Sequence, residues 1–477
     1  MFCQPISASY VFFPISKTIE KEWFAVNFIR EVNAAVNNVV WGPVMLTLLI
    51  GVGVFLSVKT RFMQFGKFGY MMKNTILGVF SKNQHQKDSS GVSPFQAVAT
   101  AMAGTIGTGS IAGLATAIVS GGPGAVFWMW VSALLGMVTK YSEIVLSLKY
   151  REKNENDQWV GGPMYYIKNG LNLKWLAALF ALFAMIACLG TGNATQSNSI
   201  AVALESTVGV NPFITGIVLT VIAAAVILGG MRRIASVNEK LVPFMAVSFV
   251  ICALVALIVN IRQVPAAFAL IFKEAFNFKA AAGGTAGYGI MLAMHYGFSR
   301  GVFSNEAGLG SAPIAHAASS TKNPVGQGLW GMFEVFFTTI IICTLSALVI
   351  LTTGIWESGE VQGAALSIAS FNKIFPGVGG VIVTAATVFF ALSTILGWAY
   401  YGEVSMEYLS HNSKTAVMIY RLIYVLFVFI GAVGSLDLIW SISETMNGLM
   451  AIPNLIGIIG LSKVIKITTK EHFDRLK

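Results

Sequence analysis

The stretch TAMAGTIGTGSIAGLATAI, residues 100–118, is apolar enough to cross a membrane, yet Gly107, Thr108, Gly109 and Ser110 stand near its centre. A glycine inside a helix costs about 1 kcal/mol relative to alanine. In hydrocarbon, backbone groups that lose their helical hydrogen bonds cost several kcal/mol more unless something binds them. The stretch therefore predicts a helix that is interrupted inside the membrane so that its freed backbone groups can bind a ligand or an ion.

Close helix packing is the alternative explanation of these glycines, since Gly109 and Gly113 form a pair of small residues one turn apart. Such packing accounts for glycines spaced along one face of a helix. It does not account for the polar residues Thr105, Thr108 and Ser110 that lie between and beside them. We therefore favour the interrupted helix.

The composition is that of a membrane protein. Of the 477 residues, 55% are hydrophobic and 11% are charged, whereas roughly 25% are charged in soluble domains. Apolar stretches of about 20 residues, the length that crosses the hydrocarbon core, recur along the chain. We expect an all-α polytopic protein with about eleven spans: an accessory span at 41–58 and ten more at 94–119, 122–149, 173–204, 211–229, 240–260, 283–302, 327–353, 377–402, 415–431 and 436–462.

The positions of the basic residues predict the topology. Most of the 31 Lys and Arg residues fall in connections on one side of this arrangement, and basic residues collect in cytoplasmic loops. We therefore expect a multi-pass protein of the cell membrane with its N-terminus outside and its C-terminus in the cytoplasm. No cleaved signal peptide is expected. The net charge of +10 then reflects topology rather than a nucleic-acid partner, and no obligatory protein partner is evident.

A second apolar stretch, AAAGGTAGYGIMLAM at 280–294, is also interrupted by small residues, among them Gly283, Gly284 and Thr285. It opens the sixth of the ten later spans, five spans after the first interruption. Two interrupted spans at this spacing predict an inverted repeat of five plus five helices. The expected units are an N-terminal extension (1–40), the accessory span (41–58), a cytoplasmic or interfacial segment (59–93), two five-helix repeats (94–260 and 261–462) and a cytoplasmic tail (463–477).

An interrupted helix offers two kinds of binding group. The half that follows the break presents free N–H groups and a positive dipole end, which suit an anion. The half that precedes it presents carbonyl oxygens, which suit an ammonium group or sodium. An amino-acid zwitterion carries both charges, so the break predicts a site for a small amino acid together with sodium as the coupling ion.

Longer motifs carry a resemblance to a known family. The chain resembles the alanine or glycine:cation symporter family from Trp41 to its C-terminus, and the resemblance implies sodium-driven amino-acid import and a leucine-transporter-type inverted repeat. The motifs that carry it are GTGSIAG (107–113), SGGPGAVFWMWVSALLGMVTKYSEIVLSLKYRE (120–152), GTGNATQSNSIA (190–201), SRGVFSNEAGLGSAPIAHAA (299–318), STILGWAYYGE (393–403) and NGLMAIPNLIG (447–457).

The resemblance also implies residue roles. It matches Ile106, Gly107, Thr108 and Gly109 to the break of the first core helix, so that the amides of Thr108 and Gly109 would bind the substrate carboxylate. The remaining implied roles are the Thr105 carbonyl for the ammonium group, the carbonyls of Ala103 and Ile106 with the hydroxyls of Ser393 and Thr394 for sodium, Gln196 for a substrate hydrogen bond, and Trp398 for a wall that limits side-chain size.

Two positions depart from the family pattern. Ser110 stands where the family usually has Asn, and Thr285 stands where it usually has Phe. A shorter side chain at either position would enlarge or wet the pocket. The resemblance therefore leaves open whether alanine is preferred over glycine, serine or another small amino acid.

Charged residues inside apolar segments suggest further roles. Lys140 and Glu143 are three residues apart, and we expect a structural ion pair near the cytoplasmic end of their helix rather than a proton relay. Glu334 is a proton site, a hydrogen-bond partner of a neighbouring helix, or a residue at an exposed helix end.

The motif at 299–318 contains three more polar residues to consider. Arg300, Asn305 and Glu306 are expected after the sixth core helix on the inner side. Arg300 would pair with Glu306 or another cytoplasmic carboxylate and close an inner gate, or the three residues would have a capping and loop role. Trp128 and Trp130 resemble interfacial anchors.

The sequence therefore predicts a sodium-coupled symporter that works by alternating access and uses no other cofactor. A proton-coupled transporter and a passive channel or facilitator remain alternatives. No facing nucleophile and base or phosphate-binding loop is apparent, so we do not expect an enzyme.

Overall fold

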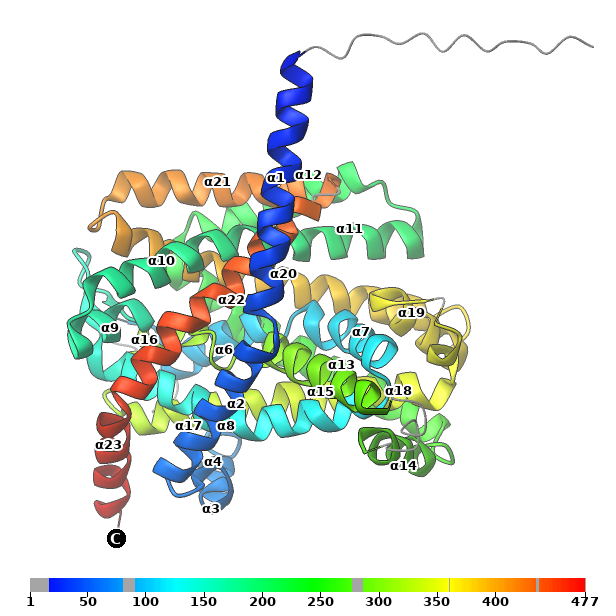
Figure 1. The fold of residues 1–477 in the computed structure, drawn as a ribbon, viewed down its shortest axis with the longest axis horizontal. Coiled ribbons are helices and arrows are strands. Elements are labelled where there is room, and N and C mark those ends of the chain that lie inside the picture. The colour runs from blue at the N-terminus through cyan, green and yellow to red at the C-terminus, as the bar shows by residue number, and fades with distance from the viewer. Residues whose placement is uncertain (1–16, 80–90, 277–285, 360, 435–436, 477) are drawn as a thin grey trace, which may run out of the picture.

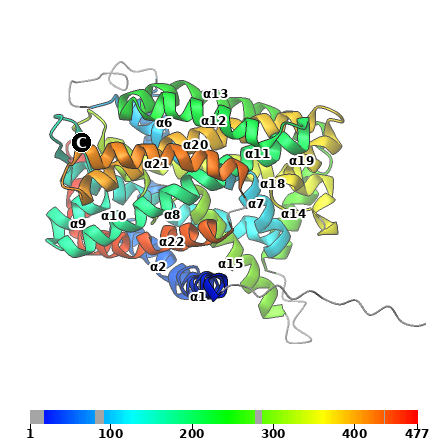
Figure 2. The same cartoon turned by 90° about the horizontal axis from the view of Figure 1, so that it is seen from above.

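The computed structural model describes residues 17–79, 91–276, 286–359, 361–434 and 437–476, and within these ranges the chain is almost entirely helical (Figure 1). Figure 2 shows α1 and α13 at opposite edges of the bundle, with α6, α8 and α20 between them. The elements before the core are α1 (Lys17–Val40), α2 (Pro43–Lys59), α3 (Met63–Gly66) and α4 (Phe68–Asn74).

The first core half begins with an interrupted helix. Its elements are α6 (Pro94–Thr105), the 3₁₀ turn η1 (Thr108–Ser110), α7 (Ala112–Gly121), α8 (Gly124–Tyr150), α9 (Pro163–Leu171), α10 (Lys174–Leu189), the π-helical turn η2 (Gly190–Ala194), α11 (Thr195–Val208), α12 (Pro212–Ile227), α13 (Gly230–Val259) and α14 (Val264–Ala275). An antiparallel hairpin of β1 (Glu152–Lys153) and β2 (Trp159–Val160) follows α8 and pairs Glu152 with Val160.

The second core half also begins with an interrupted helix. Its elements are α15 (Ala286–Asn305), α16 (Ala312–Ala317), α17 (Pro324–Val335), the π-helical turn η4 (Phe336–Cys343), α18 (Thr344–Thr353), the 3₁₀ turn η5 (Ile355–Ser358), α19 (Gly363–Ile374), α20 (Gly379–Leu409), α21 (Lys414–Val433) and α22 (Asp437–Gly460). The chain then continues into α23 (Ser462–Asp474).

Local sequence signals fix several helix starts. Ser93 and Gln96 form a capping box in front of α6, and Pro94 occupies the first turn, where its missing N–H costs nothing. The side chains of Asn211 and Asn323 cap α12 and α17 by accepting from the backbone N–H groups of Phe213 and Gly326, and each Asn is followed by proline. The first interrupted helix is therefore anchored at a precise residue before it enters the core.

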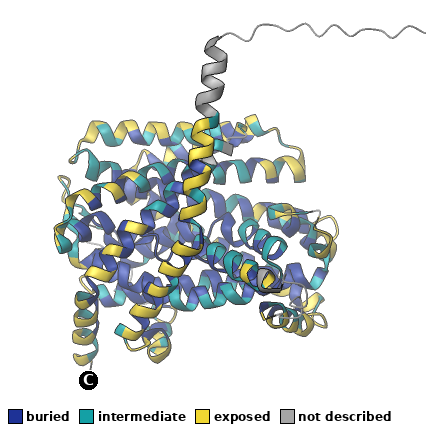
Figure 3. Ribbon diagram, in the orientation of Figure 1, coloured by how far each residue is buried: buried dark blue, intermediate teal, exposed yellow. Residues whose placement is uncertain are grey.

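The surface of the bundle suits lipid. Large apolar side chains are exposed along the outer helices, for example Val221 on α12, Phe244 on α13 and Leu422 on α21, each more than half exposed. Figure 3 shows these exposed faces around a buried interior. Within the described residues, seven helices are long and apolar enough to span a membrane, or nine when each bent pair counts as one span. The chain is a multi-pass membrane protein, and the full set of eleven spans remains a prediction.

The accessory span predicted at 41–58 corresponds to α2 (Pro43–Lys59), and the apolar helical stretch already begins at Asn27 in α1. One sequence prediction requires correction. Within the described residues the second interruption is not at 286–289: α15 is continuous from Ala286 to Asn305, and the chain leaves the helix at 306–311, before α16. Gly283, Gly284 and Thr285 lie outside the described residues. Small residues at 286–289 are thus tolerated in an unbroken helix, whereas the segment that we had interpreted as an inner loop is the break.

Candidate functional site

The first helix breaks where the sequence predicts. Ile106 leaves the helical region, Gly107 is extended, and α6 meets the segment 108–121 at 56°. The Ile106 N–H closes the first half on the Met102 carbonyl at 2.7 Å, and the Ser110 N–H starts the second half on the Gly107 carbonyl at 3.2 Å. Every residue from 103 to 110 is buried. The break therefore lies inside the protein, where its backbone groups need partners.

Two hydroxyls of α20 face the carboxyl end of α6. Thr394 Oγ1 lies 2.9 Å from the Ala103 carbonyl oxygen, and Ser393 Oγ lies 3.4 Å from it. Both hydroxyls are also 2.8–2.9 Å from the Phe390 carbonyl oxygen. The structure thus brings together three of the four residues predicted to bind sodium. The fourth, Ile106, lies fully buried at the break itself.

The Gln196 side chain contacts the start of the second half. Its Oε1 accepts from Thr108 Oγ1 at 3.0 Å and from the Thr108 N–H at 3.4 Å. Its Nε2 donates to the Thr191 carbonyl at 3.1 Å. Gln196 follows the π-helical turn η2, and such turns often occur at functional sites. An amide oxygen therefore occupies the position that the prediction gives to the substrate carboxylate.

A cavity joins these groups. Its lining includes predicted residues of the break, of α11 and of α20, together with five residues that the sequence did not single out for the site. The lining residues are Gly104, Thr105, Gly107, Gly109, Thr191, Gln196, Phe303, Glu306, Thr394, Trp398 and Asn447. The free volume is about 20 Å³, close to that of one water molecule. An amino acid can enter only if side chains such as Gln196 move.

Glu306 is the most important residue that sequence reasoning placed elsewhere. It is 2% exposed, and its Oε1 accepts from Trp398 Nε1 at 3.0 Å while its Oε2 accepts from the Ser311 hydroxyl. Its backbone φ is +56°, an uncommon conformation for a non-glycine residue. The polar residues of SNEAGLGS (304–311) could have indicated this position of Glu306, but a carboxylate after an apolar span looked like the start of a loop.

Trp398 has the predicted wall position, and Ser110 does not line the cavity. The Trp398 ring packs on Gly192, where a β-carbon would lie 2.4 Å from it. Ser110 Oγ instead lies 3.2 Å from Ser304 Oγ, behind the break. Thr285 lies outside the described residues.

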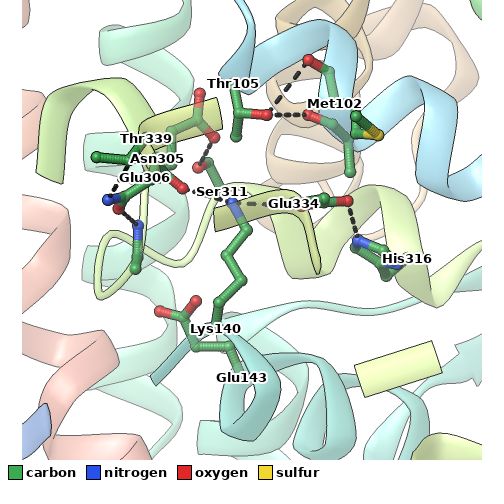
Figure 4. A network of polar contacts seen from close by, with 12 residues as sticks. Met102, Thr105, Lys140, Glu143, Asn305, Glu306, Ser311, His316, Glu334 and Thr339 are labelled. Atoms are coloured by element: carbon green, nitrogen blue, oxygen red, sulfur yellow. Dashed lines mark hydrogen bonds and ion pairs between the residues drawn. The ribbon is translucent and has the colours of Figure 1, made fainter. Parts of the chain in front are cut away.

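A buried set of charges surrounds the second interruption (Figure 4). Lys140 Nζ donates to the Asn305 carbonyl at 2.8 Å, at the end of α15, and lies 3.5 Å from Glu334 Oε2. Glu334 Oε1 lies 2.8 Å from His316 Nε2. Lys140, His316 and Glu334 are all fully buried. The ammonium group of α8 therefore caps an interrupted helix and pairs with a carboxylate of α17.

This arrangement corrects the prediction that Lys140 pairs with Glu143. Glu143 Oε1 instead accepts from the Gly308 N–H at 3.0 Å and from Asn454 Nδ2 at 2.6 Å. Asn454 Nδ2 also donates to the Gly308 carbonyl at 2.8 Å. Both charged residues of α8 thus bind the second interruption. The structure shows that Glu334 contacts neighbouring helices, and its full burial excludes the exposed helix end.

Arg300 does not pair with Glu306. Its Nη1 lies 3.8 Å from Glu444 Oε1 on α22, and both side chains are partly exposed. Because α15 continues to Asn305, Arg300 lies within the helix before the interruption and not in a loop after it, and the predicted pairing with Glu306 is wrong. Trp128 and Trp130 pack against α14 and α18, with Nε1 donating to the Ala275 carbonyl and to Thr344 Oγ1 respectively.

Solved structures support the fold. A manganese transporter of Eremococcus coleocola superposes with a TM-score of 0.52 at 14% identity, covering 82% of this chain and 89% of that chain. MhsT in complex with L-phenylalanine superposes with a TM-score of 0.52 at 13% identity, covering 81% and 99%. The predicted leucine-transporter-type arrangement is confirmed.

Sequence comparison identifies the family. The sodium:alanine symporter family matches residues 26–477. The sodium/alanine symporter AgcS of Methanococcus maripaludis is 48% identical over 452 residues, covering 93% of this chain and 97% of that protein. A putative sodium/proton-dependent alanine carrier protein of Bacillus subtilis, YrbD, is 37% identical over 454 residues, covering 92% and 91%. The chain therefore belongs to the sodium:alanine symporter family and is a cation-coupled amino-acid symporter.

Proposed function

We propose that this protein imports a small neutral amino acid, alanine first and then glycine or serine, together with sodium by alternating access across the cell membrane. The observation that carries the proposal is the break between α6 and α7, which presents the Ala103 carbonyl on one side and the Thr108 N–H on the other. The proposal is also supported by the alanine named for two relatives.

Sodium would bind between the Ala103 carbonyl, Ser393 and Thr394. All three ligands are hard oxygens, as a hard cation requires. Both hydroxyls have a second acceptor in the Phe390 carbonyl. The two hydroxyls can therefore keep donating their hydrogen bonds to the Phe390 carbonyl while their oxygen lone pairs face the ion. The Ile106 carbonyl would complete the set.

The substrate carboxylate would replace the Gln196 oxygen at the Thr108 N–H. The exchange is favourable because an anion at a helix N-terminus also gains the dipole interaction. The released Gln196 amide group can donate to the bound carboxylate. The closed cavity holds about one water molecule. The movement of the Gln196 side chain away from Thr108 would also provide the space that a small substrate side chain needs.

The substrate ammonium would lie between the Thr105 carbonyl and the Glu306 carboxylate, which line the same cavity. A carboxylate has about four lone-pair positions, and Trp398 and Ser311 use two of those of Glu306. An ion pair in this buried position would exclude molecules that lack an amino group. Trp398 would limit the side chain to a small size.

Coupling and alternating access follow from the position of the break. Sodium would fix the end of α6 and lower the cost of ordering the amino-acid site, and by linkage the amino acid would tighten sodium. The segment before α6 pairs with the segment after α16, since the Val92 N–H donates to the Ala318 carbonyl at 3.0 Å and the Ser320 N–H to the Val92 carbonyl at 2.8 Å. We propose that these two half-helices move as one unit.

Uptake by proteoliposomes tests the proposal. Labelled alanine should accumulate above its external concentration with an inward sodium gradient and should not do so with choline. Unlabelled glycine and serine should compete, and phenylalanine should not. Equal uptake with sodium and choline would exclude sodium coupling, and equilibration without accumulation would identify a passive facilitator.

Proton coupling is the second candidate, because Glu334 and His316 form a fully buried pair. It predicts that Glu334→Gln abolishes accumulation driven by a pH gradient. The sodium proposal predicts instead that Ser393→Ala with Thr394→Ala abolishes the sodium dependence. Measuring both variants under each gradient separates the two mechanisms.

A further inference from the structure

A basic cleft lies between the end of α2 and the C-terminal helix, and it shares no lining residue with the cavity of the amino-acid site. Figure 1 shows α23 beside α3 and α4 at one end of the bundle. The cleft has a volume of about 460 Å³. Its basic lining residues are Lys59, Arg61, Lys67, Lys466 and Lys470.

The charge of the cleft is strongly positive. Five basic residues line it, whereas Asp474 is the acidic residue among its described lining. Arg61, Lys67, Lys466 and Lys470 are exposed to solvent. Topology alone requires basic residues near the end of a span, but it does not require two segments 400 residues apart to direct them into one cavity.

The two walls of the cleft are held together by specific contacts. Thr469 Oγ1 fixes the α23 wall to the core, because it lies 2.8 Å from the Tyr141 hydroxyl of α8 and both residues are buried. Lys67 Nζ lies 4.6 Å from the centre of the Phe473 ring, and Tyr70 packs edge-on against the same ring at 5.3 Å. The cleft is therefore a built feature of the fold rather than a gap beside a loose tail.

Apolar side chains on the same segments are exposed. Val58 is 60% exposed, Phe62 50% and Phe65 58%, and all three belong to the α2–α3 wall. Exposed aromatic and aliphatic residues next to lysines are typical of the membrane interface. The apolar flank distinguishes the cleft from a site for a soluble anion, because it provides a surface for acyl chains next to the charges.

We propose that this basic cleft binds the headgroup of an anionic phospholipid. The phosphodiester would lie among Lys67, Lys466 and Lys470, and the acyl chains would follow Phe62 and Phe65 into the bilayer. Basic pockets at the cytoplasmic side of membrane proteins bind such headgroups, and the predicted topology puts the cleft on that side. The bound lipid would tie α23 to the α2–α3 corner.

The test is lipid-dependent thermal stability of the purified full-length protein, with bound lipid counted by native mass spectrometry. Three preparations are compared: the wild type, a cleft variant with Lys67→Gln, Lys466→Gln and Lys470→Gln, and a control with Lys73→Gln, Lys463→Gln and Lys174→Gln. The control removes the same charge from exposed positions of α4, α23 and α10 outside the cleft.

Phosphatidylglycerol should stabilise the wild type and the control in a saturable manner, and phosphatidylcholine should not. In the cleft variant the apparent affinity for phosphatidylglycerol should fall by about a hundredfold, given the contribution of each basic side chain near an anionic lipid. Lys466→Arg with Lys470→Arg, which keeps the charge, should retain binding.

Two results would overturn the proposal. If the cleft variant and the control lost the stabilisation by phosphatidylglycerol equally, the stabilisation would come from general surface charge and not from the cleft. Equal stabilisation of the wild type by inorganic phosphate or glycerol phosphate would make the ligand a soluble phosphate rather than a lipid. Neither readout depends on transport, so the outcome is independent of the proposed sodium and amino-acid site.

Discussion

The two interrupted helices satisfy their freed backbone groups in opposite ways. At the first break, the partners are neutral: Ser393 and Thr394 contact the Ala103 carbonyl, and Gln196 contacts Thr108. At the second break, the protein supplies its own ions. Lys140 caps the end of α15, and Glu143 accepts from the Gly308 N–H.

The difference between neutral and charged partners decides which partners a ligand can replace and which remain as fixed structural contacts. A neutral hydrogen bond contributes about 1 kcal/mol net, so a ligand or an ion can replace it at little cost. Breaking a buried charged pair costs about 3–5 kcal/mol, so the partners of the second break remain in place. We infer that sodium and the substrate carboxylate exchange with neutral groups at the first break. At the second break, Lys140 and Glu143 stay in place and hold α8, α15 and α17 together, and Glu306 alone faces the shared cavity.

The largest expected effect is therefore on stability, at the second break. Lys140→Met should lower the free energy of unfolding by about 3–5 kcal/mol, because it leaves Glu334 buried without its cation. The measurement is thermal unfolding of the purified protein in detergent.

The matched control is the double variant Lys140→Met with Glu334→Gln. It removes the charge of both partners and keeps an acceptor for His316, so it should recover part of the lost stability. If the double variant were as unstable as the sum of the two single variants, the pair would not be the reason for the loss.

The sequence predicted the first break because its signal is local. Small polar residues at 104–110 stand inside a continuous apolar stretch, and the partners implied by the resemblance, Thr394 and Gln196, lie where expected. The second break was missed because Glu306 and Arg300 looked like the end of a span. Its stabilising partner Lys140 is 165 residues away from Asn305, and spacing along α8 pointed to Glu143 instead. Side-chain spacing shows which residues share a helix face but not which helix that face meets.

The second largest effect should be on transport, at the first break. A β-carbon at Gly107 would lie 2.6 Å from Thr394 Oγ1 and 3.5 Å from Gln196 Oε1. Gly107→Ala should therefore weaken alanine and sodium binding by about ten- to a hundredfold, since overpacking costs about 1–3 kcal/mol. Gly113→Ala, on the same interrupted helix, meets no atom within 4 Å and should leave uptake unchanged. Normal sodium-driven uptake by Gly107→Ala would place the site elsewhere.

A third prediction concerns the neutral ligands themselves. Thr394→Val keeps the shape of the side chain and removes its oxygen, so the sodium concentration for half-maximal uptake should rise about tenfold, or roughly 1.4 kcal/mol. Thr387→Val is the matched control, because Thr387 is a buried threonine of α20 whose hydroxyl bonds only locally, to the Val383 carbonyl at 2.8 Å. An equal rise in both variants would show that the effect comes from α20 packing rather than from sodium.

The smallest effect is expected where the two breaks touch. Ser110 Oγ lies 3.2 Å from Ser304 Oγ, which also lies 3.4 Å from Cys343 Sγ, so Ser304 keeps a partner when Ser110 is replaced. Ser110→Ala should change the half-saturation concentrations by less than about fivefold, the equivalent of one neutral hydrogen bond. Because Ser110 lies behind the break rather than in the cavity lining, alanine, glycine and serine should all shift by the same factor, as measured by competition in proteoliposomes. A shift in the half-saturation concentration of one amino acid alone would mean that Ser110 contacts the substrate. The binding site at the first break would then include the residue after Gly109, which the hydrogen bonds do not indicate.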